Sequence, residues 1–182
     1  MSHSPKQTAL SEQFSPVPSP DSEVSWLDDD EQRLWRAFVA VSGGVVQEME
    51  AALKQSSNLT FGDYEVLVHL SEAPERRLRM SDLSDRLLHS HSRVTQRVDR
   101  LTKRGFVDRE RCTNDGRVTY TKLTPLGLEC IEKAAPYHVV HVRHNLMSLI
   151  KPDEIPPLVA ALERVAEQLR SKTTPSTNTD LA

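Results

Sequence analysis

Three side chains with related hydrogen-bonding chemistry recur at helical spacing in the segment 90–104. Arg93, Gln96 and Arg97 lie three or four residues apart, so a helix brings them close to one face. The guanidinium group of Arg and the carboxamide of Gln can form paired hydrogen bonds to the edges of guanine and adenine in the major groove of DNA. The residue types and their spacing therefore indicate a helix face that could read DNA bases. The alternative is a solvated helix surface, which is what most charged faces are.

A second group of arginines flanks a tight turn. Arg111 precedes and Arg117 follows the tetrapeptide Thr-Asn-Asp-Gly, and the runs on either side, 106–112 and 117–123, contain Val, Thr and Tyr. Because Gly tolerates the positive φ of such a turn, the segment predicts a β-hairpin. A hairpin tip is narrow enough to bring Arg117 to the minor groove, where negative potential is concentrated. Asp115 either holds that guanidinium or makes the turn through its own backbone.

The charge of the chain is unevenly distributed. The 182 residues have a formal net charge of -3, yet nine Lys/Arg against four Asp/Glu lie between Arg86 and Arg117. A basic segment on an acidic body lets the protein approach a polyphosphate in one orientation only.

Other function classes lack their motifs. The sequence holds no Ser-His-Asp order, glycine-rich phosphate loop or paired metal motif, so we expect no enzyme and no cofactor. Its two cysteines are too few for a disulfide scaffold. No apolar run approaches the length of a membrane span and the N-terminus lacks the order of a signal peptide, so we expect a cytoplasmic protein with no membrane partner.

Short helices must position the arginines. Thr60 followed by Asp63 is a capping-box-like start of a helix, Ser81 can cap a short helix after it, and a further helix begins near Ser90 and stops at Gly105. The positions of this last helix that we expect to point inward are Val94, Val98 and Leu101. Two helices, a basic second helix and a hairpin in this order predict a winged helix-turn-helix.

Amphipathic segments flank this module. In the first, 26–54, apolar residues recur at three- and four-residue steps, and Gly43 and Gly44 predict a bend or a close helix contact at its centre. A long helix from 124 to about 150 and a last helix that starts within 152–157 follow the hairpin. The small module cannot cover all of their apolar faces, so we expect a homodimer in which a second copy does.

Composition sets the boundaries. Residues 1–24 contain four prolines among Ser and Gln and predict a disordered N-terminal arm, while 171–182, rich in Ser and Thr, predict a flexible tail. Between them, 25–170 should form one domain of mainly α class with a small β-hairpin wing. Its parts are the winged helix-turn-helix at about 58–123 and the N- and C-terminal dimerisation helices at about 26–55 and 124–170.

The wing string resembles a family signature. Asp115-Gly-Arg117, five residues, Leu123-Thr124, two residues and Gly127 are similar to the D-x-R-x5-L-T-x-x-G pattern of the MarR family of bacterial transcription regulators, without a gap. The resemblance extends over about 30–170. It implies a dimer that binds a pseudopalindromic operator, usually as a repressor, and releases it when a small-molecule effector or an oxidant changes the distance between two reading helices.

The resemblance also implies roles by position. Ser92, Arg93, Thr95, Gln96 and Arg97 fall on the recognition helix. Arg117 falls at the wing tip, with Asp115 beside it. We expect base reading from the arginines and glutamine of this helix and phosphate contacts from Arg100, Arg104 and Arg111. A pure protein-interaction module is the alternative to a partner of double-stranded DNA.

Cysteine is one candidate for control. Cys112 lies beside the wing and Cys130 on the long helix, so oxidation offers a redox-sensing alternative that uses Cys112. Family members that sense peroxides usually carry the reactive cysteine in the first helix, which here has none.

Two further groups are candidates for binding a regulator. His138, His141 and His144 follow an H-x-x-H-x-x-H pattern that could supply imidazoles to a metal, although three-residue steps drift around a helix. Trp26 and Trp35 could line a pocket for an aromatic effector, or simply fill a gap between helices. The sequence does not name an effector.

Overall fold

A computed structural model describes residues 24–111 and 118–173 of the chain. Most of the predicted N-terminal arm, the tip of the predicted hairpin and the end of the predicted tail lie outside these residues. The chain divides into two compact units after Ala40, inside the first helix, and each unit is described by itself.

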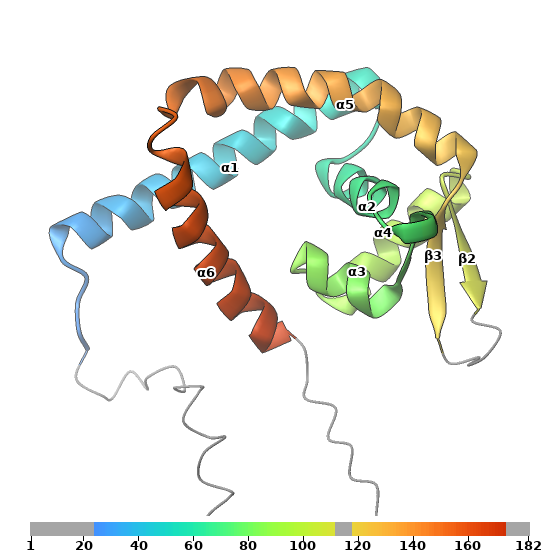
Figure 1. Ribbon diagram of the computed structural model, residues 1–182, viewed down its shortest axis with the longest axis horizontal. Helices are drawn as coiled ribbons and strands as arrows, with labels where there is room; N and C mark the ends of the chain where they lie inside the picture. Colours follow the sequence, from blue (N-terminus) through green and yellow to red (C-terminus); the bar gives the residue numbers. More distant parts are fainter. Residues whose placement is uncertain (1–23, 112–117, 174–182) are drawn as a thin grey trace, which may run out of the picture. The chain divides into compact units, whose positions relative to one another are not determined.

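The described chain is mainly helical with one small sheet, as the sequence predicts (Figure 1). Its elements in chain order are α1 (Asp29–Ser57), α2 (Phe61–Ser71), a short turn η1 (Pro74–Arg76), β1 (Arg77–Arg79), α3 (Met80–Leu87), α4 (His91–Lys103), β2 (Val107–Arg111), β3 (Thr119–Leu123), α5 (Pro125–Asn145), η2 (Met147–Leu149) and α6 (Ile155–Thr173). None of the helices in the described ranges is both long and apolar enough to cross a membrane.

Helix α1 begins three residues later than Trp26 because of a reciprocal cap. The Glu31 amide donates to Asp28 Oδ1 at 2.8 Å, and the Asp28 amide donates to Glu31 Oε2 at 3.0 Å. The helix then runs uninterrupted through Gly43 and Gly44, and a Cβ at either would meet no described atom within 4 Å. The predicted close helix contact at the glycines is therefore not found within the described chain.

The starts of α2 and α4 agree with the sequence, and the start of α3 does not. Thr60 accepts a hydrogen bond from the Asp63 amide at 3.1 Å, and α4 follows Ser90 directly. Helix α3 already begins at Met80, so Ser81 lies inside it, where its hydroxyl bonds to Asp82 instead of a backbone amide. The prediction that Ser81 caps α3 was wrong, because the preceding residues are committed to a strand.

That strand, β1, makes the sheet three-stranded. The order is β1-β3-β2, and both pairings are antiparallel, with Leu78 opposite Thr121 and Arg109 opposite Thr121 on the other side. The sequence predicts only the β2–β3 hairpin. Strand β1 consists of Arg-Leu-Arg, whose single buried residue carries no recognisable alternation.

One hydrophobic core joins α2, α3 and α4 to the sheet and to the start of α5, and Figure 1 shows these helices gathered beside the strands. Val94, Val98 and Leu101 are fully buried, as predicted. Gly127 permits the close approach of α5 to the turn between α4 and β2, because a Cβ there would overlap the carbonyl oxygen of Phe106. The core thus fixes which face of α4 is left outside.

Helices α5 and α6 differ from the predicted bounds at their ends. Helix α5 contains Pro136 but ends at Asn145, not near Ile150, since Leu146 leaves helical geometry with φ -135°. Helix α6 starts inside the predicted window and continues to Thr173, so residues 171–173 of the predicted tail are helical.

Candidate nucleic-acid interface

Helix α4 leaves three of the predicted recognition residues in solvent. Ser92, Arg93 and Gln96 are exposed near its N-terminal end, while the positions that alternate with them are buried. Among the described residues Arg93 forms no ion pair, so its guanidinium is available to a ligand. Thr95 is half-buried toward β2, where its carbonyl accepts a long 3.5 Å bond from Arg109.

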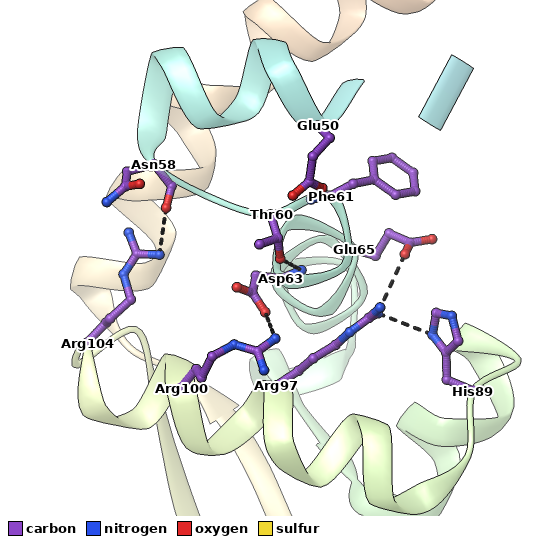
Figure 2. A network of polar contacts seen from close by, with 10 residues as sticks. All are labelled: Glu50, Asn58, Thr60, Phe61, Asp63, Glu65, His89, Arg97, Arg100 and Arg104. Atoms are coloured by element: carbon purple, nitrogen blue, oxygen red, sulfur yellow. Dashed lines mark hydrogen bonds and ion pairs between the residues drawn. The ribbon is translucent and has the colours of Figure 1, made fainter. Parts of the chain in front are cut away.

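Arg97 lies on the same helix but faces α2. Its Nη1 is 3.2 Å from His89 Nδ1 and 3.9 Å from Glu65 Oε2, and only 21% of its side chain is exposed. A Cβ on Gly62 would overlap the guanidinium carbon, so the group lies directly against the α2 backbone. Figure 2 shows Arg97 pointing from α4 toward Glu65 and His89. The three side chains expected to read bases are therefore not equivalent, because Arg93 and Gln96 are exposed and Arg97 is largely buried.

Arg100 and Arg104 also have partners inside the protein. Arg100 Nη2 donates to Asp63 Oδ1 at 2.9 Å, and that carboxylate side chain is only 5% exposed. Arg104 Nη1 donates to the Asn58 carbonyl at 2.9 Å (Figure 2), and its guanidinium carbon lies 4.5 Å from the centre of the Phe106 ring. A cation at this place suits the negative end of the α1 dipole. Both residues were predicted to touch phosphates, and these contacts leave that prediction untested.

The hairpin base is attached to α4 by an arginine that the sequence did not single out. Arg109 on β2 pairs with Asp99 at 2.8 Å. Arg111, at the end of β2, is exposed as a phosphate contact would require. The remaining predicted wing residues, Asp115, Arg117 and the neighbouring Cys112, lie outside the described residues.

The contact between Arg97 and His89 fixes a protonation state. A guanidinium group has only hydrogen-bond donors, so His89 Nδ1 must be the acceptor and must carry no proton. Burial lowers the pKa of His89, and the positive charges of Arg97 and Arg93 lower it further. Burial raises the pKa of Glu65, while the neighbouring Arg97 offsets part of that rise. Arg97 therefore joins a neutral imidazole and a carboxylate.

The histidines of the H-x-x-H-x-x-H pattern on α5 are the first candidates for control. The centre of the His138 ring is 4.6 Å from the centre of the Tyr64 ring. Its Nδ1 is buried without a hydrogen-bond partner among the described residues, and burial lowers the pKa of His138. His141 and His144 do not join it in a metal site, since the described residues contain no group of three or more His, Cys, Asp or Glu that could hold an ion.

The other candidates for control are a half-buried cysteine and two exposed tryptophans. Burial raises the pKa of the Cys130 thiol, which lowers its nucleophilicity at neutral pH. Trp26 and Trp35 are 84% and 58% exposed, and Trp35 stacks on Phe38 with ring centres 6.5 Å apart. A role for the two tryptophans in effector binding stays a prediction.

Comparisons with known proteins identify the family. The MarR family pattern matches residues 57–118. AbsC, a MarR family transcriptional regulator from Streptomyces coelicolor, is 38% identical with a TM-score of 0.76, over 81% of this chain and 99% of AbsC. Sco3205, a MarR family regulator from the same organism solved in complex with DNA, is 33% identical with a TM-score of 0.78, over 86% of this chain and 95% of Sco3205.

Curated relatives match over shorter stretches. The HTH-type transcriptional repressor IacR of Pseudomonas putida is 34% identical over 51% of this chain and 54% of IacR. The uncharacterised HTH-type regulator YkoM of Bacillus subtilis is 31% identical over 47% of this chain and 55% of YkoM, so the chain spans about half the length of these two relatives. All four proteins are described as transcriptional regulators, which confirms the expectation that this is not an enzyme. The chain belongs to the MarR family of transcriptional regulators.

Proposed function

We propose that this protein is a cytoplasmic, sequence-specific DNA-binding repressor that binds a pseudopalindromic operator as a homodimer and releases it when a small-molecule effector binds. The observation that carries the proposal is the exposed N-terminal face of α4, where Ser92, Arg93 and Gln96 stand opposite the buried core. A helix held in this way can enter the major groove with hydrogen-bonding side chains first. The DNA complex of Sco3205, 33% identical, supports the same use of the fold here.

Base reading belongs to the free side chains of α4. Arg93 can make two hydrogen bonds to guanine and Gln96 two to adenine, while Ser92 and Thr95 are short enough to contact the backbone or a thymine methyl. The wing would add Arg111 to a phosphate and Arg117, with Asp115 beside it, to the minor groove.

Exposed apolar surface on the C-terminal helices supports the homodimer. Leu158, Leu162, Val165 and Leu169 follow one face of α6 and are 44 to 54% exposed. Exposed apolar side chains also line α5, at Tyr137, Val139 and Val140. Exposed apolar helix faces of this kind mark interaction surfaces, and two copies of one chain can cover the same face symmetrically.

Repression and release rest on the relatives and the family. IacR and the Escherichia coli protein MprA, which is 27% identical over 108 residues, are described as transcriptional repressors. Release by an effector rests on the family resemblance alone, and thermal-shift screening of aromatic acids and phenols against the DNA complex would test it.

Capture of genomic fragments tests the central proposal. The purified protein should enrich fragments that share an inverted repeat with half-sites about one helical turn apart. Affinity for that repeat should fall steeply with salt, since neutralised phosphates release counterions. Recovery of fragments without a shared repeat, or of protein partners alone, would contradict this proposal and favour the alternative of a protein-interaction module.

A further inference from the structure

Arg97 and Arg93 differ in a way that bears on how α4 recognises DNA. Both are arginines of the predicted recognition face, four residues apart. Arg93 is exposed and forms no ion pair in the described chain, whereas Arg97 contacts Gly62 and Glu65 of α2 and His89 of the turn that enters α4. We propose that Arg97 is a positioning residue that sets the rotation of α4 against α2, and that it does not itself contact DNA. The inference rests on the DNA-binding function proposed above.

The contacts of Arg97 all lie on one side of α4. Gly62 and Glu65 are one turn apart on α2, and His89 precedes α4, so the guanidinium links two helices and the turn that enters one of them (Figure 2). Reaching a base would require Arg97 to leave all three contacts. A reading helix that must hold its side chains within a fraction of an ångström is better served by a fixed cation than by a free one.

A second contact acts on the same edge. Arg100, three residues after Arg97, pairs with the buried Asp63 carboxylate, which is adjacent to Gly62. Together with the buried Val94, Val98 and Leu101, two anchors at successive turns restrain the rotation of α4 about its own axis more closely than one anchor would. Ser92, Arg93 and Gln96 then point in a direction set by α2.

Gly62 is necessary for this arrangement. It lies in helical conformation without a positive φ, so an alanine side chain fits its backbone and favours the helix by up to about 1 kcal/mol. The Cβ of that alanine would occupy the place of the Arg97 guanidinium, which is the far end of a flexible side chain and can move away. Gly62→Ala therefore dislodges Arg97 while keeping its charge.

The direction of the change in operator affinity in Glu65→Gln distinguishes a positioning role of Arg97 from an effect of charge alone. Glu65 carries a negative charge close to the proposed DNA surface, so its removal alone should leave phosphate attraction unchanged or strengthen it. The carboxylate can favour operator binding only through Arg97. A loss of operator affinity in Glu65→Gln is therefore the opposite of what charge alone predicts.

The experiment measures affinity for the captured operator and for an unrelated duplex by fluorescence anisotropy at several salt concentrations. For Gly62→Ala we expect operator affinity to fall by about tenfold, the size of a lost charged hydrogen bond, with unchanged affinity for the unrelated duplex and an unchanged salt slope. Glu65→Gln should lower operator affinity by about threefold or more. In both variants the protein should discriminate less well at every base pair that α4 reads. Loss of a direct contact between Arg97 and DNA would instead reduce discrimination at a single base pair.

A matched control accompanies the charge change. Glu132→Gln removes an exposed carboxylate on α5 that forms no ion pair in the described chain. Circular dichroism and the melting temperature show whether each variant is folded. If Gly62→Ala melts at a lower temperature than the parent, the role of Arg97 is judged from Glu65→Gln. Operator binding by both variants as tight as the parent's overturns the role of Arg97. A parent protein that prefers no operator overturns the proposed function instead.

Discussion

The apolar face of α6 makes the proposed homodimer testable by one substitution. Leu158, Leu162, Val165 and Leu169 are each about half exposed, between 44 and 54%. Full burial of such a side chain contributes about 1.5 to 3 kcal/mol, so covering the exposed half contributes about 1 kcal/mol each. Four positions in two protomers then contribute about 8 kcal/mol, which is within the range of about 4 to 15 kcal/mol that association costs. A stable dimer therefore needs all of this face together with further apolar surface.

Leu162→Asp should dissociate such a dimer. The change removes about 1 kcal/mol of burial from each protomer and places a carboxylate in each half of the interface, so we expect a loss of at least about 3 kcal/mol and a dissociation constant raised at least about a hundredfold. Sedimentation equilibrium at micromolar concentrations measures this shift. Ala160→Asp is the matched control, because Ala160 lies on the opposite side of the same helix and is already exposed.

Two results would refute this reasoning. A parent protein that sediments as a monomer at tens of micromolar would show that its apolar faces have another occupant. A Leu162→Asp variant that dimerises as tightly as Ala160→Asp would show that α6 takes no part in the contact.

Three further predictions concern single side chains. Arg93→Ala should weaken operator binding by about 1 to 3 kcal/mol and relax discrimination at one base pair, as binding to a panel of operator variants would reveal; equal binding across the panel would remove Arg93 from base reading. Arg104→Ala should lower the free energy of unfolding by about 1 to 2 kcal/mol, since it loses bonds to two carbonyls at the end of α1 and its contact with Phe106; urea denaturation checks this, and an unchanged midpoint would contradict it. Burial lowers the pKa of His138 below its ordinary value of 6.5, so the stability that its neutral form contributes is present above that value and is lost as the pH falls through the lowered pKa. His138→Phe should therefore lose less stability than the parent between pH 7.5 and 5.5, and parallel losses in denaturant titrations would argue against the assignment. Part of the loss should remain in the variant, because burial also lowers the pKa of His69 and His89.

The order of the helices and the position of the hairpin were predictable because their signals are local. Thr60 caps α2 through an amide three residues away, and the inward valines of α4 are neighbours on one helix. Strand β1 was not predictable in this way. It is a strand only because β3, more than forty residues later, pairs with it, and that pairing also moved the start of α3 ahead of Ser81.

The partners of the arginines were beyond local reasoning for the same reason. Asp63 lies 37 residues before Arg100, and Asn58 lies 46 residues before Arg104. One signal was nevertheless present in the sequence. Arg93, Arg97, Arg100 and Arg104 form a stripe at three- and four-residue spacing beside the inward valines, which places them at the border of the core. Long cationic side chains at such a border can turn back toward the protein as readily as outward.

The excess of positive charge between Arg86 and Arg117 is partly neutralised by carboxylates from elsewhere in the fold. A window along the sequence counts Arg97 and Arg100 but omits Glu65 and Asp63, which fold against them from α2. Arg109 is likewise paired with Asp99. The fold therefore uses part of the positive charge to hold α4 in place, and fewer cations are left to attract any duplex. Non-specific affinity depends on the number of neutralised phosphates, whereas base reading depends on geometry. Arginines that are anchored to α2 therefore lower the affinity for any duplex and improve the discrimination between bases. On the proposed function, arginine thus contributes to selectivity in two ways, through Arg93 in the groove and through Arg97 behind it.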